Sequence, residues 1–210
     1  MTPTQYSPLI AGIRELLRRP LPGLPAQMLM APRPRPGTER ILDPAPDCRH
    51  AGVLVLLYPC DGGLCLVLTL RTDLLDNHRG QISFPGGSTE PGESVVEAAL
   101  REAQEELAVD PAGLEVLGQL SPLYISPSRF CIYPTVAFAP ERPHFVPEQG
   151  EVAEVIEVPL ALLLDPATIR EEAWTIRDMP VQVPFYRIGP HKVWGATAMV
   201  LAELTRLLAA

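Results

Sequence analysis

The segment from residue 82 to residue 107 constrains the fold of this chain more than any other. A short β-prone stretch, residues 82–84, runs into the glycine turn at residues 85–87, and a helical pattern follows over residues 93–107. On a helix with about 100° per residue, the apolar side chains form one stripe, made of Val96, Leu100, Ala103 and Leu107. Such a stripe must be covered by a neighbouring layer, so the segment predicts a helix packed on a sheet beside a tight glycine turn.

The carboxylates of this helix are arranged unfavourably for stability alone. Glu102, Glu105 and Glu106 share one face, and like charges three or four residues apart each cost about 0.2–0.5 kcal/mol. Anions near the end of a helix also oppose its macrodipole. A solvated acidic face is the ordinary alternative, but the preceding glycine turn favours a function. Hard divalent cations bind clustered carboxylates, so we interpret the three as metal ligands, with the Gly86 carbonyl as a further candidate.

Charge and composition narrow the possible partners. The net charge is −8, and residues 87–115 contain eight acids and one base, so the remaining surface is nearly balanced. This excludes nucleic-acid binding through a basic surface. Without an apolar run of 18 residues or a signal-like start, we expect a cytoplasmic protein with no membrane partner. We expect free thiols, because the cysteines show no zinc-binding spacing: Cys48, Cys60, Cys65 and Cys131.

The organisation of the chain predicts an α+β fold with a mixed sheet. Residues 1–49 are interpreted as an N-terminal helix, capped by Ser7 and ended by Pro20, and a Pro-rich extended arm that packs on the domain of residues 50–210. Two strands, residues 53–58 and 64–71, form a predicted hairpin. Further strands are expected near 114–120, 130–139, 151–158 and 182–188, with a helical turn at 159–164 and a final helix at 194–208 that begins with Trp194. Irregular interleaving of strands with few helices argues against a doubly wound sheet.

The acidic helix and its turn resemble a known motif. The chain contains Gly87-x5-Glu93-x7-Arg101-Glu102-Ala103-Gln104-Glu105-Glu106-Leu107-Ala108-Val109, which is similar to the Nudix box. Ala108 alone departs, since the family usually has glycine at this left-handed helix end. The resemblance implies a Nudix fold, in which a mixed β-sheet lies between α-helices (α/β/α) and the box forms a loop–helix–loop. It also implies a pyrophosphohydrolase that needs Mg²⁺ or Mn²⁺, in which Glu93 lies near the metal and pairs with Arg101.

A second resemblance covers residues 66–87 and 192–198, which are similar to the coenzyme A pyrophosphatase branch of that family. It implies a small-molecule substrate, coenzyme A or a thioester or oxidised form of it. The expected products are a 4′-phosphopantetheine compound and adenosine 3′,5′-bisphosphate. His78 is expected to contact the substrate or to orient Gln81. Arg71 either grips a phosphate or forms a surface ion pair, and Phe84 either packs under the acidic helix or touches the substrate.

The sequence leaves several alternatives open. The general base is Glu151 or Glu154, unless a glutamate of the box serves instead. The substrate is coenzyme A or another nucleoside diphosphate derivative. A nucleotide-sensing module without activity is a further alternative, which the retained carboxylates disfavour. The chain is expected to be a monomer or a homodimer.

Overall fold

The computed structural model describes residues 6–34, 48–72, 80–126, 128–176 and 178–209. In chain order its elements are α1 (Ser7–Leu17), α2 (Gly23–Gln27), the 3-10 turn η2 (Met28–Met30), β1 (Arg49–Cys60), β2 (Gly63–Arg71), β3 (Ile82–Ser83), β4 (Gly86–Ser88), α3 (Val95–Leu107), η4 (Pro111–Gly113), β5 (Glu115–Gln119), β6 (Leu123–Ile125), β7 (Phe130–Phe138), β8 (Val152–Pro159), α4 (Leu160–Leu164), η5 (Pro166–Thr168), β9 (Ile169–Ile176), β10 (Met179–Ile188), β11 (His191–Val193) and α5 (Gly195–Leu208).

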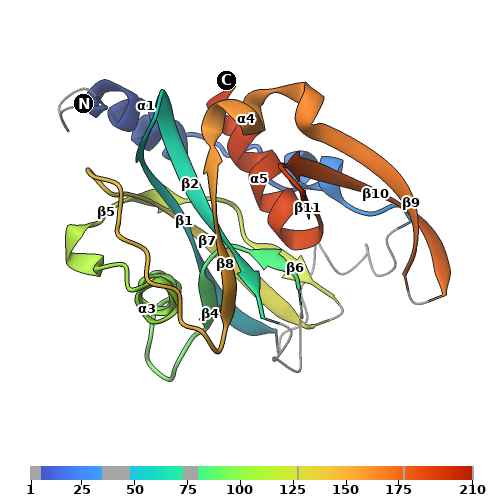
Figure 1. Ribbon diagram of the computed structural model, residues 1–210, viewed down its shortest axis with the longest axis horizontal. Coiled ribbons are helices and arrows are strands. Elements are labelled where there is room, and N and C mark those ends of the chain that lie inside the picture. Colours follow the sequence, from blue (N-terminus) through green and yellow to red (C-terminus); the bar gives the residue numbers. More distant parts are fainter. Residues whose placement is uncertain (1–5, 35–47, 73–79, 127, 177, 210) are drawn as a thin grey trace.

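The central layer is a mixed sheet that, in the described part of the chain, has eight strands. Its main path is β3-β2-β1-β7-β5, and β4, β6 and β8 pair with β1, β7 and β2 respectively. Strands β1 and β7 are parallel, whereas the other pairs are antiparallel. Helix α3 covers one face and α5 the other (Figure 1). This three-layer α+β arrangement confirms the predicted fold class.

Both faces of the sheet are buried, which explains the continuous apolar run of β1. Leu54 and Leu56 of β1 point toward Ala103 and Leu107 of α3. The alternate residues Val55 and Leu57 belong to the core that includes α5. Because successive side chains of a strand point to opposite faces, a strand covered on both sides needs apolar residues at every position.

The described N-terminal residues pack on the domain. Helix α1 contacts β5, and α2 contacts α5. The connection to α5 is a buried carboxylate: Glu203 accepts hydrogen bonds from Gly23 N at 3.1 Å, Gln27 Nε2 at 2.8 Å and Ser121 N at 3.1 Å. The division of the chain at residue 49 stays a prediction.

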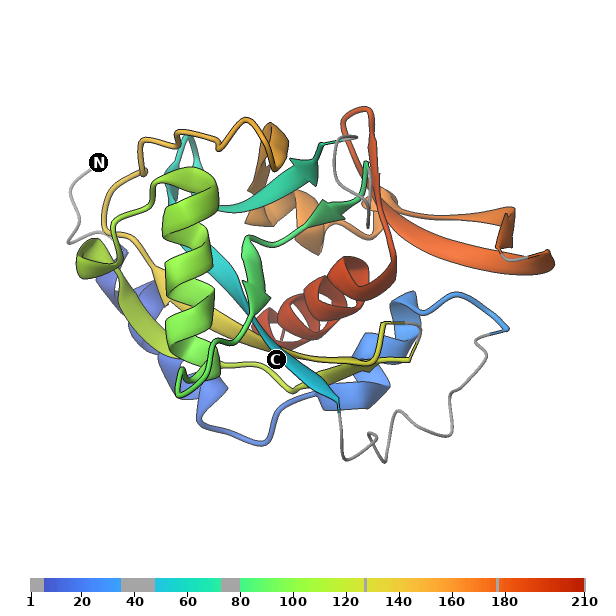
Figure 2. The same ribbon diagram turned by 90° about the horizontal axis from the view of Figure 1, so that it is seen from below.

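A smaller sheet has the order β11-β10-β9 in the described residues. Its β9–β10 hairpin projects from the body of the molecule, as Figure 2 shows. Strand β11 leads directly into α5. None of the helices that the structure describes combines the length and the apolar character needed to span a bilayer.

The expectation of four free thiols is wrong. The structure contains disulfides between Cys48 and Cys131 and between Cys60 and Cys65. Parallel pairing of β1 with β7 brings the first pair together, and the short β1–β2 hairpin brings the second pair together. Cys48 and Cys131 are 83 residues apart, so their spacing carries no signal, whereas Cys60 and Cys65 are only five residues apart and lie on opposite sides of the predicted hairpin.

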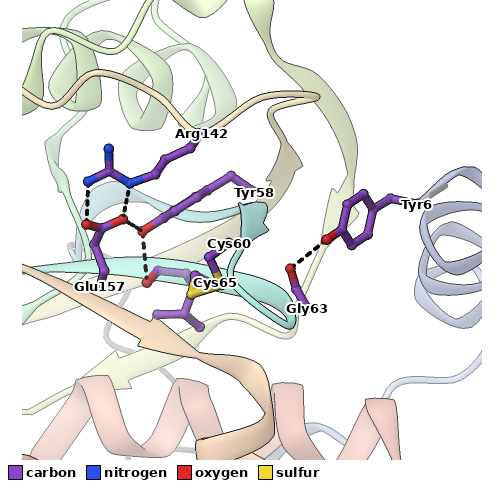
Figure 3. The surroundings of a disulfide bond; sticks show 8 residues. Tyr6, Tyr58, Cys60, Gly63, Cys65, Arg142 and Glu157 are labelled. Atoms are coloured by element: carbon purple, nitrogen blue, oxygen red, sulfur yellow. Dashed lines mark hydrogen bonds and ion pairs between the residues drawn. A yellow bond between two sulfur atoms is a disulfide. The ribbon is translucent and has the colours of Figure 1, made fainter. Parts of the chain in front are cut away.

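Figure 3 shows the Cys60–Cys65 disulfide near the end of the β1–β2 hairpin. The hydroxyl of Tyr58 donates to Glu157 Oε2 at 3.0 Å, and Arg142 binds the same carboxylate through two nitrogens. From α1's side, the hydroxyl of Tyr6 donates to the Gly63 carbonyl at 3.0 Å. This end of the hairpin is therefore held by hydrogen bonds to Glu157 of β8 on one side and to Tyr6, the N-cap of α1, on the other.

Four local expectations also need correction. Helix α1 begins at Ser7 with Tyr6 as its N-cap, so Ser7 is not the cap. Part of the expected extended arm is helical, as α2 and η2. The glycine turn forms strand β4, because Gly86 and Gly87 pair with β1. The prediction also missed β6, β9 and β11, which are short or largely exposed.

Candidate functional site

Glycines bring α3, β1 and β4 into close contact. A Cβ atom at Gly52 of β1 would lie 2.0 Å from the carbonyl oxygen of Val95, at the start of α3. A Cβ atom at Gly87 of β4 would lie 2.3 Å from the carboxylate of Glu102. The helix can therefore rest directly on β1, with the Glu102 carboxylate pressed against the backbone of β4.

The start of α3 is fixed by its own side chains. The Ser94 side chain accepts from Glu97 N, and the Glu97 carboxylate accepts from Ser94 N, which makes a capping box. At the other end, Ala108 adopts the left-handed conformation, with φ 57°, that the Nudix box usually assigns to glycine. Its N–H donates to the Gln104 carbonyl at 2.9 Å, and the N–H of Val109 donates to the Ala103 carbonyl at 3.4 Å, so the replacement of glycine keeps the cap.

Arg101 connects the acidic helix to the preceding loop. Its Nε lies 2.8 Å from Glu93 Oε1 and its Nη2 lies 3.2 Å from Glu93 Oε2, which is the expected two-pronged pair. Nη2 also donates to the Ser88 carbonyl at 3.1 Å, and Nη1 lies 2.9 Å from both Glu102 Oε1 and Glu105 Oε2. The hydrogen bond from Arg101 lowers the pKa of Glu93.

Glu106 is the most deeply buried carboxylate of the site. It is only 3% exposed, and burial raises its pKa to about 8. Arg71 opposes this rise, with Nη1 at 3.4 Å from Glu106 Oε1, as does the backbone of Gly86, whereas the negative charges of Glu102 and Glu151 add to it. Glu106 Oε2 accepts no hydrogen bond from the described residues. An unpartnered buried carboxylate oxygen indicates a missing cationic or donor partner.

Glu102 shares this surplus of negative charge. Burial raises the pKa of Glu102, and Glu105 and Glu151 raise it further, although Arg101 acts in the opposite direction. Glu105 is the most exposed of the three, with 59% of its side chain accessible. The face predicted from the helical spacing therefore contains the buried Glu106, the partly buried Glu102 and the exposed Glu105.

The end of β2 and the start of β8 complete the site. Arg71 Nη2 lies 3.6 Å from Glu151 Oε2, so the guanidinium lies between Glu151 and Glu106. Glu154 is directed elsewhere, because its Oε1 lies 3.2 Å from His191 Nε2. Of the two candidate bases, the structure brings only Glu151 to the buried carboxylates.

Of the remaining predicted substrate residues, Gln81 lies at the site and Phe84 lies in the core. Gln81 is exposed beside Arg71, and its carbonyl accepts from Arg71 N at 3.0 Å. Phe84 is 4% exposed and belongs to the core that includes α5, so the expectation that it packs under the acidic helix is wrong. Ile82 packs against the same core. Phe84 follows it by two residues, and alternate residues of an extended segment share a face, so Phe84 enters that core as well. His78 lies outside the described residues.

The donor set fits a divalent cation, although the side chains do not converge as a ready-made site. No three His, Cys, Asp or Glu side chains of the described chain are grouped tightly enough to hold a metal as they stand. The unpartnered oxygen of Glu106 and the raised pKa values of Glu102 and Glu106 nevertheless show that positive charge is lacking here. Oxygen ligands of this kind are those that Mg²⁺ and Mn²⁺ prefer.

A family model described as NUDIX domain matches residues 49–178. The chain belongs to the Nudix family. This Nudix hydrolase is 35% identical to a Nudix hydrolase named NudL from Photorhabdus laumondii, over 75% of this chain and 84% of the relative. It is also 35% identical to the human mitochondrial coenzyme A diphosphatase NUDT8, over 91% of this chain and 76% of the relative.

A solved structure supports the fold alone. The crystal structure of the Nudix hydrolase RenU from M. smegmatis aligns with a TM-score of 0.50 at 20% identity. The alignment covers 77% of this chain and 86% of that chain. The predicted family is therefore confirmed, and the fold follows with it.

Sequence reasoning missed the contribution of Gly52 to this Nudix site. A lone glycine inside an apolar strand is a signal for close approach of another backbone, and at Gly52 that backbone is the first turn of α3. The carbonyl of Ser88, which accepts from Arg101, had no sequence signal, because any residue can supply it.

Proposed function

We propose that this Nudix pyrophosphohydrolase cleaves the diphosphate of coenzyme A, or of its thioester or disulfide. The products are a 4′-phosphopantetheine compound and adenosine 3′,5′-bisphosphate. The observation that carries the proposal is the buried Glu106 carboxylate, which faces Arg71 through Oε1, is crowded by Glu102, and has no partner for Oε2 among the described residues. Residues 66–87 and the similarity to the human coenzyme A diphosphatase support the choice of substrate.

In this proposal the acidic face holds Mg²⁺ or Mn²⁺ through Glu102, Glu105 and Glu106, with the Gly86 carbonyl as a further ligand. When bound, the cation neutralises diphosphate charge and lowers the pKa of a coordinated water. Glu93 acts beside the metal by holding Arg101, which in turn fixes the loop and the Glu102 and Glu105 side chains.

Arg71 and Glu151 serve the substrate side. The Arg71 fork, which pairs with Glu106 and Glu151, matches the oxygens of a phosphate and exchanges its partners when the substrate binds. Glu151 accepts the proton from water as the water oxygen attacks phosphorus. The bond from phosphorus to the bridging oxygen breaks, and the second phosphate leaves with that oxygen. Gln81 and His78 are proposed to contact the substrate, and Phe84 to support the turn from within the core.

The proposal is tested by incubating the pure enzyme with coenzyme A and Mg²⁺ or Mn²⁺. We expect adenosine 3′,5′-bisphosphate to accumulate, as measured by chromatography, and Glu106→Gln to lower turnover by orders of magnitude in a folded protein. Glu148→Gln is the matched control, since that carboxylate lies outside the proposed ligand set. Rapid hydrolysis of ADP-ribose or a nucleoside triphosphate with coenzyme A untouched would refute the proposed substrate, and unchanged turnover in Glu106→Gln would refute the proposed ligand.

Two further expectations stay predictions: a cytoplasmic location, and a monomeric or homodimeric state. Sedimentation of the pure protein measures the second. Thiol labelling in cell extracts bears on the first, because disulfides such as Cys48–Cys131 are rare in a reducing cytosol.

A further inference from the structure

Both tryptophans of the chain and its single lysine meet on the small sheet. The rings of Trp174 and Trp194 are edge to face, with centroids 5.1 Å apart, and Trp174 stacks on Phe185 at 6.4 Å. Lys192 Nζ lies 5.8 Å from the centre of the Trp174 ring and 5.3 Å from that of Phe185. We call Trp174, Phe185, Lys192 and Trp194 the aromatic cluster. The proposed roles of the acidic site use none of these residues.

The strand register explains why the aromatic cluster shares one face. Trp174 of β9 pairs with Val181 of β10, and Lys192 of β11 pairs with Arg187 of β10, so these side chains and Phe185 alternate onto the same side. The other side of β10 and β11 carries Tyr186 and Val193 into the core with α5. The aromatic cluster therefore faces away from that core.

One carboxylate holds the cluster in place. Glu172 Oε2 accepts from Lys192 Nζ at 2.6 Å and from Trp174 Nε1 at 3.0 Å. The Lys192 side chain is 36% exposed, and both tryptophans are partly exposed. Phe185 is only 1% exposed, so the two tryptophans provide the accessible aromatic surface. Such a surface beside an accessible cation is suited to a ligand that combines a flat ring with an anion.

The cluster lies beside the edge of the main sheet that carries the proposed active site. Thr197 Oγ1, in the first turn of α5, donates to the Ile82 carbonyl at 2.8 Å, and β3 leads directly into the glycine turn. His191, next to Lys192, contacts Glu154, which pairs with Leu70 at the end of β2. The aromatic cluster is thus one residue (Lys192 to His191) and three residues (Trp194 to Thr197) in the chain from contacts with the strands that position Arg71 and Gly86.

We propose that the aromatic cluster binds the adenine ring and the 3′-phosphate of the substrate, with the base on the tryptophans and the phosphate on Lys192. This inference rests on the proposed function, because it assigns one end of coenzyme A. The charge of the surface favours that end: among the described strand residues, this side of the small sheet has three cations, Arg170, Arg187 and Lys192, and one carboxylate, Glu172. The pantetheine arm is uncharged and gains nothing from three cations. Lys192 exchanges Glu172 for the phosphate when the ligand binds.

The position of the tryptophans provides a direct test that needs neither metal nor turnover. Since both tryptophans belong to the cluster, tryptophan fluorescence, excited at the red edge where tyrosine does not absorb, reports on this surface alone. We expect adenosine 3′,5′-bisphosphate to quench the full-length protein saturably. Adenosine 5′-monophosphate should bind about tenfold more weakly, because it lacks the charge-assisted bond to Lys192. 4′-Phosphopantetheine should leave the fluorescence unchanged.

Variants separate the two parts of the ligand. Lys192→Met should weaken the bisphosphate about tenfold and leave adenosine 5′-monophosphate unaffected, whereas Trp174→Leu should weaken both at least about fivefold. Arg206→Met removes an exposed cation from the far end of α5 and should change neither affinity. Thermal melting identifies a variant that is misfolded, and Trp174→Phe then replaces Trp174→Leu, with affinity retained.

Failure of this inference is distinct from failure of the proposed function. Coenzyme A hydrolysis without quenching by the bisphosphate, or equal loss of both nucleotides in Lys192→Met, would overturn the subsite while the activity stands. Quenching by 4′-phosphopantetheine alone would assign the surface to the other half of the substrate and also overturn it. Specific quenching by the bisphosphate in a protein that leaves coenzyme A intact would support the subsite and refute the activity.

Discussion

Replacing Glu106 by glutamine should stabilise the metal-free protein, by an amount that grows as the pH rises from 4.5 to about 8. Burial raises the pKa of this carboxyl from 4.5 to about 8. Between these two values the folded protein keeps the proton that the unfolded chain has lost, so stability falls as the pH rises from 4.5 to about 8 and is then constant. Below pH 4.5 both states are protonated, and the carboxyl costs nothing.

The pKa values give the size of the effect. A rise from 4.5 to about 8 corresponds to a penalty of about 5 kcal/mol on the ionised form, and about 2–5 kcal/mol is expected once the site relaxes. Glu106→Gln removes this charge while keeping the shape of the side chain. For a chain of this size each kcal/mol shifts the melting temperature by about 2–4 °C, so the difference should be evident at pH 9 and vanish near pH 4.5.

The assay is urea unfolding of wild type and Glu106→Gln in excess chelator, repeated at intervals from pH 4.5 to pH 9. Glu105→Gln is the matched control, because Glu105 lies on the same face but is exposed, so this substitution removes no buried charge. Adding Mg²⁺ should then stabilise wild type and not Glu106→Gln. A stability gain of equal size at every pH, or a loss at pH 9, would refute the argument that an uncompensated charge is buried here.

Three other substitutions test the geometry around this charge. Gly87→Ala places a Cβ atom 2.3 Å from the Glu102 carboxylate; displacing that group by an ångström should lower kcat/KM about 100-fold, while the melting temperature shows whether the fold persists. Ala108→Gly should stabilise the protein by about 1 kcal/mol in urea unfolding, because residue 108 has φ 57°; a loss of stability would show that the left-handed cap is not strained. Glu203→Ala should destabilise it by about 3–5 kcal/mol, since three donors lose their buried acceptor, whereas a change below 1 kcal/mol would indicate that water replaces the carboxylate.

The acidic helix and its surroundings could be predicted from the sequence because their signals are local. The helical period over residues 93–107 gave α3, which spans Val95–Leu107. The apolar runs around the glycine pair at 62–63 gave the β1–β2 hairpin. The pairing of Glu93 with Arg101 followed from the resemblance to the Nudix box, and the structure contains it. Strands β6 and β9 each pair with the next strand of the chain, but β6 has only three residues and β9 is largely exposed, so neither left a comparable apolar pattern.

The choice between Glu151 and Glu154 shows why the rest of the site could not be predicted. The alternation of side chains along a strand tells which face each residue is on, but not which residue of the neighbouring strand lies beside it. In the structure the β2–β8 register shifts between Leu70 and Arg71, so Leu70 pairs with Glu154 but Arg71 pairs with Val152. This irregularity leaves Glu151 beside Arg71 and Glu154 beside His191. A register shift is a property of two strands together, and neither strand alone encodes it.

Two arginines allow the acidic helix to tolerate the repulsion between its carboxylates. Arg101 contacts three carboxylates, and Arg71 contacts two, yet both guanidiniums lie at the edges of the acidic face and leave Glu106 Oε2 unpartnered among the described residues. A set of cations placed for stability alone would neutralise the most deeply buried carboxylate first, because an unpaired charge costs most there. Here the arginines balance the charge of the more exposed carboxylates, and the charge of the buried Glu106 stays only partly balanced. That distribution is what a site needs if its charge is to be balanced by a bound cation rather than by the protein.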